Sequence, residues 1–168
     1  HADNLRAELS LAPPADCARN YIEGRADVAL LPAAVVPSLT DANIITDYCI
    51  GAVGAVRTVT VMSHHPISAV KRIWLDPHSR TSVQLCGYLA KHKWHITPEW
   101  IAMSDYARVD SPEEGDAFLL IGDKVFGYEG RFPYIYDLAI EWREATKLPF
   151  AFAVWVARKG VPNEVTDE

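Results

Sequence analysis

Short runs of apolar and β-branched residues alternate along this chain with segments whose apolar residues have helical spacing, and this alternation most constrains its fold. Strands are expected over residues 5–11, 26–32, 44–49, 57–63, 72–75, 99–103, 117–121, 134–137 and 150–157. Helices are expected from the prolines at 13–14 to the glycine at 24 and over 33–39, 81–93 and 138–146, with a polar loop at 105–115. Such alternation predicts an α/β protein with a mostly parallel sheet and helical crossovers.

Composition and charge exclude several classes of protein. Of the 168 residues, 49% are hydrophobic, which is typical of a globular chain with one domain or two small lobes. The net charge of -6 and the lack of any Lys/Arg cluster argue against a nucleic-acid partner. No apolar run approaches the roughly 20 residues that span a bilayer, and no signal peptide is visible. We therefore expect no membrane partner and a cytoplasmic location, whereas the sequence does not indicate an oligomeric state.

The cysteines and histidines indicate neither disulfides nor a metal site. Cys17, Cys49 and Cys86 lie far apart and form no CxxC pair, so we interpret them as free, buried, small hydrophobic residues in a reducing compartment. His92 and His95 are three residues apart but have no evident third ligand nearby. The sequence therefore predicts no bound metal ion.

Two long strands follow flexible or proline-bearing turns and differ in this from the other strands. They are expected within Gly54–Ser63 and Leu148–Ala157. A chain that crosses from one lobe to another and back would need two such strands. We therefore predict a hinge between two lobes at these segments.

A dense group of hydrogen-bond donors lies between a predicted strand and a predicted helix. Ser79, Arg80, Thr81 and Ser82 stand at this helix start. There the free N–H groups and the helix dipole favour an anion, and an arginine can bind a carboxylate through two hydrogen bonds. The alternative is an ordinary capped helix with Ser79 as the N-cap residue.

Two further segments are candidate parts of a binding site. The small residues of Gly51–Thr58 would let a ligand approach the backbone closely, although a plain loop is an equal alternative. Gly122–Lys124 follows a predicted strand at its carboxyl end, where open α/β sheets bind ligands. Asp123 could instead cap the next helix, and His78 is a possible acid or base within the donor group.

The order of these motifs resembles one family, the chorismate dehydratases of menaquinone biosynthesis (MqnA, futalosine pathway). Each motif is short, but their joint order and spacing from about Leu9 to about Lys159 is specific. The matching segments are Gly24–Pro32, Asp47–Gly51, Gly54–Thr58, Ser79–Val83, Leu120–Asp123, Tyr136–Leu138, Glu141–Trp142 and Leu148–Trp155.

The resemblance implies a type II periplasmic-binding-protein-like fold: two α/β lobes, two crossing strands and a ligand cleft between the lobes. The corresponding boundaries are residues 1–56 for the first lobe, 57–148 for the second and 149–168 for the return strand. In the family, a strand with a Ser-Tyr-Leu-Asn-like motif precedes the matching region and helices follow it. We expect both to lie outside this chain.

The resemblance also implies a reaction: loss of water from chorismate to give 3-[(1-carboxyvinyl)oxy]benzoate. No cofactor is expected, because aromatisation of the ring drives the elimination. Thr58 matches a hydroxyl position, usually serine, and is implied to be catalytic. The residues implied to bind the substrate are Gly54, Arg57, Ser79, Arg80, Thr81, Ser82, Gly122 and Asp123. The chain departs from the family at Val53, often Asp, and at Ala55, often Pro.

Two other functions fit the same fold. One is a non-catalytic binding protein for a small carboxylate, since fold alone does not separate binding from catalysis. The other is the related enzyme of the same pathway that releases dihydroxynaphthoate and uses a catalytic histidine.

Overall fold

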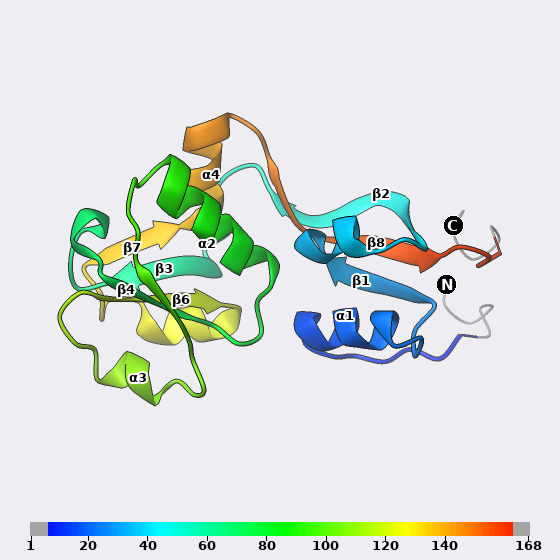
Figure 1. Ribbon diagram of the computed structural model, residues 1–168, viewed down its shortest axis with the longest axis horizontal. Helices are drawn as coiled ribbons and strands as arrows, with labels where there is room; N and C mark the ends of the chain where they lie inside the picture. The colour runs from blue at the N-terminus through cyan, green and yellow to red at the C-terminus, as the bar shows by residue number, and fades with distance from the viewer. Residues whose placement is uncertain (1–6, 163–168) are drawn as a thin grey trace. The chain divides into compact units, whose positions relative to one another are not determined.

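The computed structural model describes residues 7–162 and divides into two compact units. The smaller unit contains the residues up to Ile50 together with those from Ala151 onward, and the larger unit contains Gly51–Phe150. Figure 1 labels the helices and strands of each unit. Each unit has its own buried core, so each is described by itself.

The smaller unit is a sheet with helices packed against it. Its helical elements are α1 (Pro14–Ile22) and the 3₁₀ helix η2 (Ala33–Ser38). Its strands are β1 (Val28–Pro32), β2 (Ala42–Ala52) and β8 (Phe150–Arg158), in the order β1-β8-β2. The core cluster under α1 consists of Ala18, Tyr21, Ala29, Leu31, Val35 and Val156.

The larger unit is built on a five-stranded sheet among the described residues, in the order β5-β4-β6-β3-β7. Its strands are β3 (Val59–Ser63), β4 (Arg72–Leu75), β5 (Glu99–Ala102), β6 (Asp116–Ile121) and β7 (Tyr134–Asp137). Its helices are α2 (Thr81–His92), α3 (Ala107–Asp110) and α4 (Leu138–Thr146), with 3₁₀ turns η3 (Ile67–Ala69) and η4 (Asp123–Tyr128).

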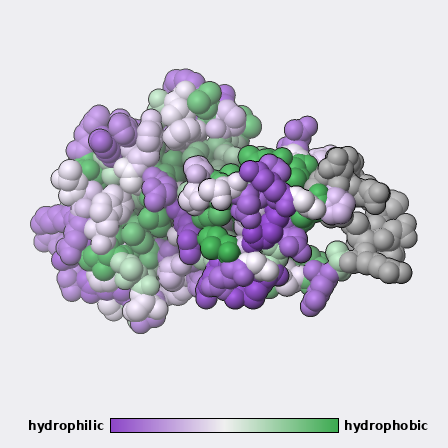
Figure 2. Space-filling view, turned by 45° about the vertical axis from the view of Figure 1, so that its right-hand side comes forward, coloured by the Kyte–Doolittle hydropathy of each residue, from purple (hydrophilic) through white to green (hydrophobic). Residues whose placement is uncertain are grey.

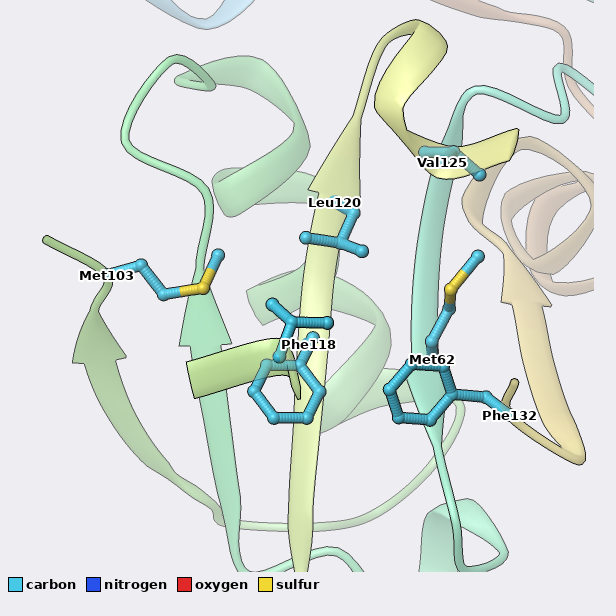
Figure 3. Packing of buried hydrophobic residues seen from close by; sticks show 7 residues of the cluster. Met62, Met103, Phe118, Leu120, Val125 and Phe132 are labelled. Carbon is cyan, nitrogen blue, oxygen red and sulfur yellow. The ribbon is translucent and has the colours of Figure 1, made fainter. Parts of the chain in front are cut away.

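The larger sheet is covered on both faces. Helices α2 and α4 lie on one face, and α3 lies on the other, as Figure 1 shows. On the α3 face, the buried cluster joins the sheet to α3 and η4 (Figure 3). Its members are Met62, Met103, Val109, Phe118, Leu120, Val125 and Phe132. A sheet buried on both faces fixes the positions of the loops at its edges.

Strand direction is where the sequence interpretation is wrong in part. In the larger sheet β4 runs parallel to β5 and β6, but β3 pairs antiparallel with both β6 and β7. The connection from β3 to β4 is only residues 64–71, which is shorter than the dozen or so residues of a parallel crossover. In the smaller sheet β1 pairs antiparallel with β8, a partner that the local pattern around β1 does not encode.

Some of the helices and strands that the sequence predicts are confirmed, and others are wrong. The bounds of β4 and α4 match the prediction, and η2 forms where a short helix was expected. The strand expected at 5–11 is wrong over its described part, because residues 7–11 form no strand and Leu9 and Leu11 are 82% and 91% exposed; residues 5 and 6 lie outside the described residues. The polar loop expected at 105–115 contains the short helix α3.

The cysteines are free, as expected, but differ in burial. Cys86 lies on the buried face of α2, Cys17 is partly buried, and Cys49 is exposed on β2. The expectation of burial is wrong for Cys49 because β2 is an edge strand of a small sheet, and most of its residues are exposed.

Hydrophobic and hydrophilic residues are mixed on the surface seen in Figure 2. Ile44, Tyr48 and Ile50 of β2 are each more than half exposed. Within residues 7–162, no helix is both long enough and apolar enough to cross a membrane.

Candidate functional site

Most of the predicted site residues lie in loops at one end of the strands of the larger sheet, the end where β4 and β6 have their last residues. Because β4 and β6 are parallel, with Leu75 beside Leu119, both strands end there. Because β3 is antiparallel to β6, its first residue Val59 lies opposite Ile121 at the same end. The loops that follow β4 and β6, at the carboxyl ends of these strands, therefore lie at the same end of the sheet as the loop that precedes β3.

The structure joins Thr58 directly to Gly122. The backbone N–H of Gly122 donates to the carbonyl oxygen of Thr58 at 2.8 Å. Gly122 has φ 76° and ψ -170°, a conformation that is essentially restricted to glycine. Within residues 7–162, the hydroxyl of the half-buried Thr58 makes only one long contact, of 3.4 Å to the carbonyl oxygen of Val56, and can therefore reorient toward a ligand.

A buried carboxylate, that of Asp76, connects the loop after β4 to the loop after β6. Asp76 is 1% exposed. Its Oδ1 accepts from the N–H of His78 at 3.0 Å, and its Oδ2 accepts from the N–H of Ile121 at 3.2 Å. The Nζ of Lys124 donates to the same Oδ2 at 2.7 Å. One carboxylate therefore contacts His78, just before Ser79–Ser82, as well as Ile121 and Lys124, which flank Gly122–Asp123.

Tyr106, which directly precedes α3, completes this network. Its hydroxyl donates to Asp76 Oδ1 at 3.1 Å and accepts from Lys124 Nζ at 2.6 Å. The Lys124 ammonium also lies 4.5 Å from the centre of the Tyr106 ring. Burial alone would lower the pKa of Lys124, but its hydrogen bonds to Asp76 and Tyr106 raise it above its ordinary value. Burial raises the pKa of Tyr106, so this pair is an ammonium and a neutral phenol at neutral pH.

The start of α2 differs from the capped helix that was the alternative. Arg80, not Ser79, is at the N-cap position, and its side chain makes no capping hydrogen bond. The N–H of Ser79 donates to the carbonyl oxygen of Asp76 at 3.3 Å. Thr81 and Ser82 are 7% and 4% exposed, whereas Arg80 is exposed. The helix start therefore presents an exposed guanidinium beside two buried hydroxyl residues.

The surroundings of Arg57 and Gly54 give less support than expected for a role in ligand binding. The Arg57 guanidinium is paired with Glu129 at 3.0 Å and lies 5.5 Å from the centre of the Phe126 ring. Arg57 has φ 62°, and its N–H donates to Asp137 Oδ2 at 2.6 Å. Gly54 is exposed, and a side chain there would meet nothing within 4 Å. No conformational need for glycine exists at that position.

The remaining candidates lie in ordinary surroundings. Gly122 is at the N-cap of η4 and Asp123 is its exposed first residue, so the alternative of Asp123 as the cap is wrong. His78 is exposed. His92 stacks on Tyr88, with ring centres 4.5 Å apart. Among the described residues, no three His, Cys, Asp or Glu side chains gather in a way that could hold a metal ion.

Three residues that shape this end of the sheet were given no role of their own from the sequence: Asp76, Tyr106 and Asp137. Lys124 was noted only as the last residue of the candidate segment Gly122–Lys124. Asp76 directly follows a strand and Asp137 directly precedes a helix, and both positions are recognisable signals. Tyr106 lies in a polar loop and has no signal, because its place beside Asp76 depends on packing between distant segments.

Comparisons with known proteins agree with the motif order. A family model described as menaquinone biosynthesis matches residues 2–168. Chorismate dehydratase of Thermus thermophilus is 27% identical over 173 residues, which are 90% of this chain and 61% of that protein. The crystal structure of protein AF1704 from Archaeoglobus fulgidus matches with a TM-score of 0.70 and 20% identity, over 96% of this chain and 60% of that one, and shows similarity of fold alone.

The chain thus spans about three fifths of the length of these two relatives. The match to the family model nonetheless extends over nearly the whole chain, and the resemblance predicted from the motifs is confirmed. This chain belongs to the menaquinone biosynthesis family.

Proposed function

We propose that the protein is a chorismate dehydratase, which removes water from chorismate and releases 3-[(1-carboxyvinyl)oxy]benzoate. The observation that supports this most is that three loops, around Thr58, Ser79–Ser82 and Gly122–Asp123, lie at the same end of the larger sheet. Their joint chemistry suits a small ring with carboxylates: N–H groups, hydroxyls and the exposed guanidinium of Arg80. The relative from Thermus thermophilus carries the same name.

The fold that goes with this proposal is periplasmic-binding-protein-like, of type II. Its lobes would be residues 1–56 and 57–148, with 149–168 as the return strand. The mixed α/β character and the two sheets are compatible with such a fold.

In the proposed reaction, the C–H bond at the ring carbon that bears the ether breaks. Its electron pair forms the third double bond of the ring while the neighbouring C–O bond to the ring hydroxyl breaks. The departing hydroxide and the released proton together form one water, so atoms and charge balance. Aromatisation supplies the driving force, and the protein must mainly hold the substrate in a reactive geometry.

Each group of residues has a separate role in this proposal. Ser79–Ser82 bind one substrate carboxylate at the start of α2, where the helix dipole favours negative charge. The substrate's own enolpyruvyl carboxylate accepts the proton. Thr58 donates a hydrogen bond that orients this group, because its hydroxyl is half-buried and only weakly engaged.

Thr58 offers a sharp test. Thr58→Val keeps the shape of the side chain but removes the hydroxyl, and we expect kcat for the aromatic product to fall by roughly 100-fold. Thr58→Ser keeps the hydroxyl and should retain most of the rate. The denaturation midpoints of both variants serve as the folding control. An unchanged rate in a well-folded Thr58→Val protein would exclude this role for the hydroxyl.

A further inference from the structure

The Asp76–Lys124–Tyr106 network does more than bury a charge, because it ties together the loops that form the proposed site. We propose that Lys124 is a positioning residue for substrate binding: through Asp76, it fixes the turn that leads into Ser79–Ser82. This inference rests on the proposed function for its substrate, but its structural part can be tested without chorismate.

The geometry supports a chain of contacts from Lys124 to the turn. Lys124 Nζ donates to Asp76 Oδ2 at 2.7 Å, and Asp76 Oδ1 accepts from the N–H of His78 at 3.0 Å. The carbonyl oxygen of Asp76 accepts from the N–H of Ser79 at 3.3 Å. The conformation of the residues just before α2 is therefore set by the position of the Asp76 carboxylate and backbone.

Burial explains why the ammonium of Lys124 is needed. The side chain of Asp76 is fully buried, whereas that of Lys124 is 30% exposed. A buried carboxylate without a cation is strongly destabilised, so it would move toward water. This movement weakens its hydrogen bond to the N–H of His78 and releases the turn. Lys124 itself remains partly hydrated and loses less when the pair breaks.

The pair of Asp116 and Arg108 offers a matched control for Asp76 and Lys124, at the other end of the strands of the same sheet. The side chain of Asp116, at the start of β6, is fully buried too, and Arg108 Nη2 pairs with its Oδ2 at 2.8 Å. The Arg108 guanidinium stacks on an aromatic ring, that of Trp74, at 5.1 Å, as Lys124 does on Tyr106. Arg108→Met therefore removes one cation from a buried carboxylate at the opposite end of β6 from Ile121, although Arg72 still pairs with Asp116.

The experiment compares Lys124→Met, Lys124→Arg and Arg108→Met in the whole protein. We expect Lys124→Met to raise the KM for chorismate by roughly 10- to 100-fold, since a misplaced binding group costs about this much. Ser79–Ser82 would bind the substrate carboxylate equally in the ground state and in the transition state. Misplacing this segment should therefore change kcat by less than about 3-fold. Lys124→Arg restores a cation beside Asp76 and should recover most of the affinity, and Arg108→Met should leave KM unchanged.

Hydrogen exchange gives a readout that needs no substrate. Lys124→Met should speed amide exchange at His78 and Ser79, whose N–H groups donate to Asp76, while Arg108→Met should leave these two amides protected even if it lowers overall stability. Tyr106→Phe removes one donor to Asp76 but keeps the ring, so it is the milder variant to use if Lys124→Met does not fold.

The outcomes separate the two claims. If wild-type protein does not convert chorismate, the proposed function fails, and hydrogen exchange alone decides the positioning role. If the amides of His78 and Ser79 exchange no faster in Lys124→Met than in Arg108→Met, the positioning role is refuted whatever the substrate is. A KM increase that is shared equally by Arg108→Met would refute it as well.

Discussion

The carboxylate of Asp137 has two structural tasks, and replacing it tests both. Its Oδ1 accepts from the N–H groups of Ala139 at 3.0 Å and Ile140 at 3.2 Å, which caps α4. Its Oδ2 accepts from the N–H groups of Val56 at 2.9 Å and Arg57 at 2.6 Å, which holds the loop before Thr58. Asp137→Ala removes both sets of hydrogen bonds.

The expected cost follows from these contacts. Loss of an N-cap aspartate costs about 1 kcal/mol of unfolding free energy. The hydrogen bonds to Val56 and Arg57 add about 1 to 2 kcal/mol, at the lower end for bonds to a charged group because water reaches the exposed Arg57. We therefore expect Asp137→Ala to lower the free energy of unfolding by about 2 to 3 kcal/mol. Asp137→Ser keeps a good N-cap and should lose only about 1 to 2 kcal/mol.

Urea unfolding followed by tryptophan fluorescence measures this difference. The larger unit contains Trp74, Trp94, Trp100 and Trp142, so the signal reports mainly on the unit that holds Asp137. The reasoning is refuted if Asp137→Ala costs less than about 0.5 kcal/mol, or if Asp137→Ser is as destabilising as Asp137→Ala.

Three further changes have defined expectations. Burial alone would raise the pKa of Asp116, but the N–H of Glu113 and the Arg72 guanidinium hold it below its ordinary value. The ionised Asp116 therefore stabilises the fold above the unfolded pKa of about 4, and this stabilisation is lost as the pH falls further. The free energy of unfolding of Asp116→Asn should lack this part of the decline in acid. Burial raises the pKa of the Cys86 thiol to about 12, so stability should decline as the pH rises from 9 toward 12, and less so in Cys86→Ala. Lys147 ends α4 with φ 66°, and thermal unfolding should show Lys147→Gly to be more stable by about 0.5 to 1 kcal/mol; a lower midpoint would contradict this.

The elements that sequence predicts best here are those with strong signals at both ends. Strand β4 ends at Asp76-Pro77, and α4 begins after its capping aspartate, so their bounds could be predicted from neighbouring residues alone. The direction of β3 could not, because it depends on β6 and β7, which lie far along the chain. Leu9 and Leu11 are exposed and residues 7–11 form no strand, so an alternating pattern alone is not sufficient to form a strand.

The loops of the candidate site could be proposed from the sequence, but the hydrogen bonds that link these loops could not. A donor-rich segment between a strand and a helix made Ser79–Ser82 candidates, and the position after a strand made Gly122–Lys124 a candidate segment. The link between them passes through Asp76, Lys124 and Tyr106, which lie on three different segments. Only the folded sheet brings these side chains together, so no local pattern could assign them a shared role.

The most direct test of the proposed function is conversion of chorismate by the wild-type protein, expressed at the length that its gene encodes. Chromatography with mass detection should show chorismate being replaced by one product that is lighter by a single water and has the ultraviolet absorption of a substituted benzoate. Formation of that product in proportion to enzyme and time is the result that we predict. Tight binding of chorismate without any product, from folded protein, would contradict the enzymatic claim and favour a binding protein.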